Sequence, residues 1–181
     1  MKKHLLIGIF LLVGICSHTY AQGIRWGLKG GLAVGTPYGT SIIRTPETSR
    51  IGFNAGVFVN IPINVDVLVS PEITYIQKGF TYNGTNVFSD YLQFATTLKV
   101  NMGDAPFYTT LGPFVSYLPQ VNELAPQQKS LEAGGILGLG YRFSEQVSLE
   151  GRYQFSNHIW ESPVIERFRN AALDVSLSYL F

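Results

Sequence analysis

Three ionisable side chains gather around one short turn of the chain. Arg142, Glu150 and Arg152 flank the segment Ser144-Glu145-Gln146 and share one face of the two strands predicted on either side of it. Across such a hairpin Arg142 lies diagonal to Glu150, within reach of long side chains. The set could bind an ion or conduct protons. It could also be a structural ion network, because buried charges need partners, and we favour this structural interpretation.

Further charges fall on the polar face of the other predicted strands. We expect five of them to join the same network: Lys29, Glu72, Lys99, Glu132 and Asp174. The polar face is also predicted to carry Arg25, Asp66 and Lys78. The apolar face carries no charge. The charges are therefore expected to lie together on one side of the sheet.

A serine, a histidine and a carboxylate come close together at one place in the sequence. Ser156-Asn157-His158 is followed by Glu161, a set that a lipid hydrolase could use, with the histidine as base and the carboxylate orienting it. The spacing argues against this use, since Ser156 is expected to point inward from a strand while His158 lies at a loop edge. We therefore predict no catalytic residue and no enzymatic activity.

Cysteine and histidine are too scarce for other site chemistry. The chain has one cysteine and three histidines, and Cys16, His4 and His18 all lie in a predicted leader. This composition excludes disulfides, cysteine catalysis and Cys/His metal sites in the rest of the chain. The glycines do not form a phosphate-binding loop. We expect no metal and no cofactor.

The composition fits a protein whose surface does not face water everywhere. Of 181 residues, 46% are hydrophobic and only 14% are charged, against roughly 25% charged in soluble domains. The formal net charge is +1 and there is no basic block, so nucleic-acid binding is excluded as a function. The length predicts a single domain.

The start of the chain has the pattern of a cleavable export signal. Two lysines precede an apolar run over residues 5–15, and Ala21 supplies the small residue at the predicted cleavage site. The apolar run is too short to span a roughly 30 Å hydrocarbon core as a helix. Lipid attachment at Cys16 is an alternative, although the preceding isoleucine is bulkier than that motif uses. We assign residues 1–21 to a signal peptide and residues 22–181 to one outer-membrane β-barrel domain.

Alternation of apolar and polar residues with period two dominates the rest of the chain, and this period is that of a β-strand. Eight strands are predicted, over Trp26 to Val34, Ile51 to Ile61, Val69 to Lys78, Leu92 to Met102, Phe107 to Leu118, Leu131 to Phe143, Val147 to Phe155 and Leu173 to Phe181. The register of Phe107 to Leu118 stays open, because both of its faces are apolar. The uncharged stretch 105–122 is no helix, since it contains three prolines.

The connections between the predicted strands alternate in length. The short ones are Pro62-Ile63-Asn64, Gly103-Asp104-Ala105-Pro106 and Ser144-Glu145-Gln146, and the long ones are Gly35 to Arg50, Gly79 to Asp90, Pro119 to Lys129 and Asn157 to Arg169. Outer-membrane barrels have short periplasmic turns and longer extracellular loops. The fold class predicted is therefore all-β, an eight-stranded antiparallel up-and-down transmembrane β-barrel in which the last strand pairs with the first.

The placement of charged and small residues predicts that the apolar face points outward to lipid. The charged face is otherwise filled with small residues such as Gly52, Gly138 and Ser176, as a narrow, crowded lumen requires. Aromatic residues near the strand ends fit the interfacial girdles of lipid barrels. The turn side would carry Trp26, Phe107, Phe143 and Phe181, and the loop side Tyr75, Tyr117 and Phe155.

The chain resembles the PorT-like family of outer-membrane β-barrel proteins. The resemblance rests on Trp26-Gly27-Leu28-Lys29-Gly30-Gly31-Leu32, Ser70-Pro71-Glu72-Ile73-Thr74-Tyr75-Ile76-Gln77-Lys78-Gly79, Tyr91-Leu92-Gln93-Phe94, Leu98-Lys99, Pro106-Phe107-Tyr108, Leu111-Gly112-Pro113-Phe114, Gly138-Leu139-Gly140-Tyr141 and Tyr179-Leu180-Phe181. It implies a multi-pass barrel of the bacterial outer membrane, inserted by the assembly machinery with Phe181 as the C-terminal signal. Some members of the family are tied to secretion across the outer membrane.

These observations predict a non-enzymatic outer-membrane barrel with a lumen filled by side chains. It would act as a structural component, as a secretion accessory, or by binding through loops that carry Tyr38, Tyr82, Phe88, Trp160 and Phe168. Its expected partners are outer-membrane lipid, lipopolysaccharide and envelope or secretion-system proteins. The alternatives are a narrow solute or ion channel, a membrane-embedded lipid hydrolase and a soluble lipocalin-like barrel.

Overall fold

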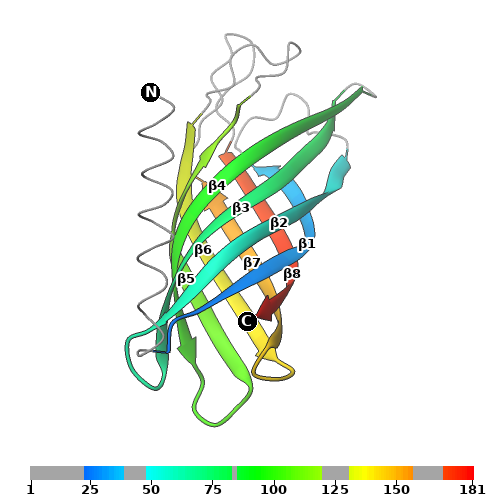
Figure 1. Cartoon of the computed structure of the whole chain (residues 1–181). Helices are drawn as coiled ribbons and strands as arrows, with labels where there is room; N and C mark the ends of the chain where they lie inside the picture. The colour runs from blue at the N-terminus through cyan, green and yellow to red at the C-terminus, as the bar shows by residue number, and fades with distance from the viewer. Residues whose placement is uncertain (1–22, 39–47, 83–84, 120–130, 157–168) are drawn as a thin grey trace, which may run out of the picture.

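The described residues form one closed antiparallel β-barrel. The computed structural model describes residues 23–38, 48–82, 85–119, 131–156 and 169–181. Their strands are β1 (Arg25–Tyr38), β2 (Thr48–Pro62), β3 (Val67–Tyr82), β4 (Thr85–Asn101), β5 (Phe107–Tyr117), β6 (Leu131–Arg142), β7 (Val147–Ser156) and β8 (Arg169–Leu180). Each strand pairs with its neighbours in chain order, and β8 closes on β1 (Figure 1). The predicted fold class is confirmed. The predicted signal peptide lies outside the described residues.

The strands run further toward the loop side than the alternation pattern predicted. β3 has 16 residues and β4 has 17, and their pairing continues to Tyr82 opposite Thr85. The prediction of a long loop over Gly79 to Asp90 was therefore wrong, because this segment extends the hairpin. Phe80 and Tyr82 of this extension lie at the even positions that carry charges in the rest of β3, so the alternation that outlined the strand does not continue in the same register.

The turn side of the barrel is held by side chains that bond the backbone. The Oδ1 atom of Asn64 accepts hydrogen bonds from the backbone N–H groups of Asp66 at 2.9 Å and Val67 at 2.8 Å. Asp66 thus belongs to the exposed turn before β3, and its predicted place on the polar face of a strand was wrong. In the β6–β7 turn, Ser144 Oγ accepts in the same way from the N–H group of Val147 at 3.1 Å.

Closure between the first and last strands includes a close approach at a glycine. Gly31 of β1 lies opposite Ser176 of β8. A Cβ atom at position 31 would overlap the backbone carbonyl oxygen of Val175, so only glycine lets the two strands meet here. The closed ring leaves no unpaired strand edge, as hydrocarbon surroundings require.

The outward face of the barrel is an apolar band with aromatic residues at its turn-side rim. Outward side chains such as Leu28, Leu177 and Val175 are about half exposed, whereas the inward side chains of the same strands are buried. The rings of Trp26 and Phe181 stack with centroids 4.1 Å apart. The turn-side rim also contains the ring contacts Phe107–Tyr141, Tyr141–Phe143 and Tyr179–Phe181.

The structure settles the one register that the sequence left open. In β5 the even positions from Tyr108 to Leu118 point inward and are mostly buried, and the odd positions from Phe107 to Tyr117 point outward. Both faces of this strand are apolar because its inward face contributes large side chains to the lumen. In the described ranges, no helix is long and apolar enough to cross a membrane.

We expect a charge on the middle of the outward face to destabilise the barrel. Val175 lies on β8 four residues before Tyr179 of the aromatic rim, near half the height of a band roughly 25 Å tall. Val175→Arg should lower the free energy of unfolding by about 2–4 kcal/mol, whereas Val175→Leu should change it little. Urea titrations of the protein in phospholipid vesicles measure both. Equal stabilities of the two variants would place this face away from lipid.

Candidate functional site

The lumen holds a balanced set of buried charges. Among the described residues, eight charged side chains are at least nine-tenths buried, and four are cationic and four anionic: Lys29, Lys78, Lys99, Arg152, Glu72, Glu132, Glu150 and Asp174. All come from inward positions of their strands. Because a buried charge without a partner is costly, the contacts of these side chains determine what the lumen can do.

Arg152 of β7 is the centre of the largest network. Its guanidinium group forms a two-pronged ion pair with Glu72 of β3, in which the second hydrogen bond, from Nη2 to Oε2, is 3.0 Å long. It also donates to Glu150 through Nε at 2.9 Å and Nη2 at 3.1 Å. β3 and β7 are four strands apart in the ring, so this contact joins opposite walls of the barrel. Arg152 is only 2% exposed.

Lys29 completes this network from a third strand. Its Nζ atom in β1 lies 2.8 Å from Oε1 of Glu72. The network thus contains two cations and two carboxylates and is neutral as a whole. Arg152 binds Glu72 through two hydrogen bonds from its planar guanidinium group, which is the strongest geometry for an arginine–carboxylate pair.

A second ion pair lies nearer the loops and is separate from the first. Nζ of Lys78 in β3 is 3.4 Å from Oε1 of Glu132 in β6. The same ammonium group lies over the rings of Tyr91 and Phe114, 5.0 and 5.6 Å from their centroids. The sequence pattern predicted Glu132 in the network around Arg152 and no partner for Lys78. The two pair because the curvature of the barrel brings β3 and β6 together across the lumen.

Asp174 is held by neutral donors. Nε2 of Gln154 donates to its Oδ2 atom at 2.8 Å, and Oγ of Ser176 lies 3.3 Å from its Oδ1 atom. Ser176 Oγ in turn lies 3.0 Å from Oδ1 of Asn54 in β2. Within the described part of the chain, Asp174 has no cation within 4.0 Å, so its predicted place in the ion network was wrong.

Arg142 and Lys99 lie apart from the ion pairs, at the turn-side end of the lumen. Nη2 of Arg142 donates to Oδ1 of Asn101 at 2.7 Å. The predicted approach of Arg142 to Glu150 does not form an ion pair. Instead, the ring of Tyr108 lies under the Arg142 guanidinium at 5.1 Å, and the Tyr108 hydroxyl is 3.3 Å from Oε2 of Glu150.

Large apolar side chains also fill the lumen, and the alternation pattern did not predict them. The buried inward residues include Phe58, Ile76, Tyr91, Tyr108, Phe114, Leu118 and Ile136. Two of the rings lie opposite glycines on β6: Tyr108 opposite Gly140, and Phe114 opposite Gly134. A Cβ atom on either glycine would collide with the facing ring. Glycines at inward positions of one predicted strand, opposite aromatic residues of the neighbouring strand, were the sequence signal that could have revealed this packing.

The remaining predicted residues are only partly described. Ser156 is buried on the inward face of β7, as expected, whereas Asn157, His158 and Glu161 lie outside the described residues. Phe181 follows β8, and its backbone N–H donates to the carbonyl oxygen of Trp26 at 2.9 Å. The C-terminal residue is thus tied to the first strand.

Comparisons with known proteins match this architecture. The family model described as outer membrane protein beta-barrel domain matches residues 20–156. Neisserial surface protein A (NspA) superposes with a TM-score of 0.57 at 15% identity, covering 88% of this chain and 99% of that structure. The attachment invasion locus protein Ail of Yersinia pestis, solved with the heparin analogue sucrose octasulfate, gives 0.51 at 15% identity, covering 87% and 99%. No curated protein matches the sequence significantly.

Removing only the cation of the central network should reduce the stability of the barrel more than removing the cation and a carboxylate together. Arg152→Met leaves Glu150 buried without a cation, and we expect a loss of about 3–5 kcal/mol in the free energy of unfolding. Adding Glu150→Gln should recover a large part of that loss, since Glu72 keeps Lys29 as its partner.

Urea titrations of the protein in phospholipid vesicles measure these free energies of unfolding. An exposed ion pair provides the control. Arg25 and Glu145 lie 3.9 Å apart at the turn side and are largely exposed. Arg25→Met should change stability by less than about 1 kcal/mol. If the double variant Arg152→Met/Glu150→Gln is as unstable as Arg152→Met alone, the unpaired carboxylate is not the cause of the loss.

Proposed function

The chain belongs to the outer membrane protein beta-barrel domain family, and on that premise we propose that it is a non-enzymatic scaffold whose plugged barrel holds its loops at the cell surface. Those loops bind envelope or secretion-system proteins, or assist secretion in the manner of the PorT-like proteins that the sequence resembles. Lipid and lipopolysaccharide surround the apolar band.

One observation carries this proposal: the ion pairs join opposite walls of the lumen. Arg152 of β7 contacts Glu72 of β3 at the centre, and Lys78 of β3 contacts Glu132 of β6 nearer the loops. Side chains that meet across an eight-stranded barrel occupy the space that a water-filled channel would need. A barrel filled in this way serves as a rigid support, so the function is assigned to its connections.

The PorT-like role rests on sequence motifs distributed along the barrel. Several of them supply residues of the lumen, such as Lys29, Glu72 and Lys99. These residues stabilise the barrel and do not define a task, so the secretion-accessory role depends on the loops. The loop segments 39–47, 120–130 and 157–168 lie outside the described residues.

A filled lumen should not conduct ions. We expect the purified protein in planar bilayers to give no discrete conductance steps, because the bridge between Arg152 and Glu72 closes the cross-section. The double variant Arg152→Ala/Glu72→Ala, which removes the bridge, serves as the comparison and should raise the conductance. Discrete steps from the unmodified protein that Arg142→Ala alters would favour the narrow channel instead.

Binding through the loops predicts a one-sided crosslinking pattern. A photoreactive residue at Ala125 or Trp160, both in long connections, should give discrete adducts with envelope proteins in intact cells. The same residue at Val65, which is exposed in the β2–β3 turn, serves as the control and should give none of these adducts. Identical adducts from both sides, or none from the loops, would contradict loop-mediated binding.

The non-enzymatic assignment has its own test. Incubation of the purified protein with outer-membrane lipid extracts should release no fatty acids or headgroups, as measured by mass spectrometry. If release occurs and His158→Ala abolishes it, the chain is a lipid hydrolase and the assignment fails. His158 is the residue to replace because it is the one histidine after the predicted leader.

A further inference from the structure

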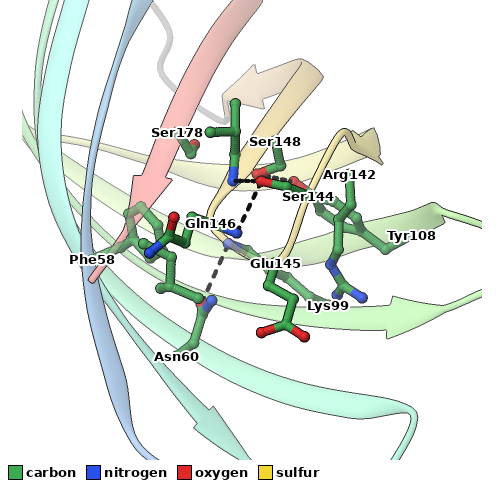
Figure 2. Close-up of a pocket in the computed structure, with 12 residues that line it drawn as sticks. Phe58, Asn60, Lys99, Tyr108, Arg142, Ser144, Glu145, Gln146, Ser148 and Ser178 are labelled. Atoms are coloured by element: carbon green, nitrogen blue, oxygen red, sulfur yellow. Dashed lines mark hydrogen bonds between the residues drawn. The ribbon is translucent and has the colours of Figure 1, made fainter.

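A small cavity opens at the turn-side end of the lumen, at the opposite end from the loops. We call it the turn-side vestibule, and its polar lining includes Asn60, Lys99, Tyr108, Arg142, Ser148 and Ser178 (Figure 2). These side chains come from several different strands and converge beneath the β6–β7 turn. The cavity has a volume of about 30 Å³.

The vestibule contains two cations that lie outside the ion pairs described above, Lys99 and Arg142. Lys99 is only 5% exposed, and its Nζ atom makes one hydrogen bond, to Oδ1 of Asn60 at 3.4 Å. Its other neighbours are the rings of Phe58 and Tyr108, 4.5 and 5.8 Å away. Neither Lys99 nor Arg142 has a carboxylate within 4.0 Å among the described residues. An ammonium group has three donors, so Lys99 can still donate to a bound group.

The one carboxylate that lines the vestibule does not neutralise these cations. Glu145 belongs to the β6–β7 turn, and its side chain is 89% exposed. Among the described residues, its ion-pair partner is Arg25, at 3.9 Å. Glu150, which the Tyr108 hydroxyl group contacts, is already paired with Arg152.

From this arrangement we propose that the turn-side vestibule binds a carboxylate group. A cavity of about 10–15 Å³ holds one water molecule, so the vestibule, with about 30 Å³, has room for about two oxygen-sized atoms. The two oxygens of a carboxylate match this space, and the ammonium group of Lys99 and the free guanidinium N–H groups of Arg142 are suitable donors. The hydroxyl groups of Ser148 and Ser178 provide further hydrogen bonds at the wall of the cavity.

The surface beside the vestibule indicates where the carboxylate comes from. A shallow hollow of about 540 Å³ shares Ser144, Glu145, Gln146 and Leu180 with the vestibule and adds Arg25 and Phe181. It has room for several residues of an extended chain, with an apolar wall at Phe181. The carboxylate is thus the C-terminus of a periplasmic polypeptide that enters from the turn side. This site is independent of the loops to which the proposed function is assigned.

Titration calorimetry on the detergent-solubilised protein, purified from outer membranes, tests the site. The probes are the tripeptide acetyl-Ala-Ala-Ala with a free carboxylate, the same tripeptide as its C-terminal amide, and acetate. We expect the free acid to bind and the amide not to bind. Tighter binding of the tripeptide than of acetate supports a polypeptide as the source, whereas equal binding assigns the site to small free acids and overturns the polypeptide.

Variants connect the binding to the two cations. Lys99→Met and Arg142→Gln should each weaken tripeptide binding by about tenfold or more, the loss expected for a hydrogen bond to a charged group. Glu145→Gln should strengthen binding, because it removes a negative charge from the rim without changing a buried residue. The matched control is Lys78→Met/Glu132→Gln, which removes a buried ion pair elsewhere in the lumen and should leave the affinity unchanged.

Retained heat-modifiable mobility on gels shows that each variant is folded. Binding of the amide as tight as that of the acid would overturn the proposal. So would absence of binding by both the acid and acetate, or an affinity that neither Lys99→Met nor Arg142→Gln lowers.

Discussion

The structure depends on one constraint: in hydrocarbon, backbone N–H and C=O groups can pair only with each other. A sheet satisfies this requirement only when its last strand returns to its first, and β8 pairs with β1 through the close approach at Gly31. The apolar band and its aromatic rim then follow from the solvent outside. Closure with eight strands also makes the lumen narrow, so inward side chains are pressed against one another and withdrawn from water.

That narrow lumen explains why charges are paired across it. Arg152, Glu72, Glu150 and Lys29 form a neutral group that joins opposite walls, and Lys78 pairs separately with Glu132 between aromatic rings. The packing continues with large apolar side chains that fit against glycines of β6. The turn-side end departs from this pattern, because Lys99 and Arg142 lie at a cavity without a carboxylate partner among the described residues. The lumen is therefore filled by paired charges at its centre, while Lys99 and Arg142 lie outside these pairs at its turn-side end.

Family membership and fold identify an outer-membrane β-barrel, while the proposed functions rest on groups at the two ends of the barrel. The similarity to NspA and Ail, at 15% identity, concerns the fold alone. The proposed surface role belongs to the loops, and the proposed carboxylate site belongs to the turn side. The two proposed sites lie at opposite ends of the barrel, and the filled lumen separates them.

The sequence by itself determined the barrel, its strand order and the direction in which each face points. The reason is local: a period of two puts charges and small residues on one face of every strand, and this pattern is visible along the chain. It predicted that Glu72, Glu150 and Arg152 are buried together, but it failed where the apolar positions leave the register of the rest of the strand, as in the extension of β3 and β4. Only the tertiary structure decided which charges meet, because partners such as Lys78 and Glu132 are 54 residues apart. Their pairing, and the separation of Arg142 and Lys99 from the ion pairs, depends on strand stagger and barrel curvature, which no local pattern encodes.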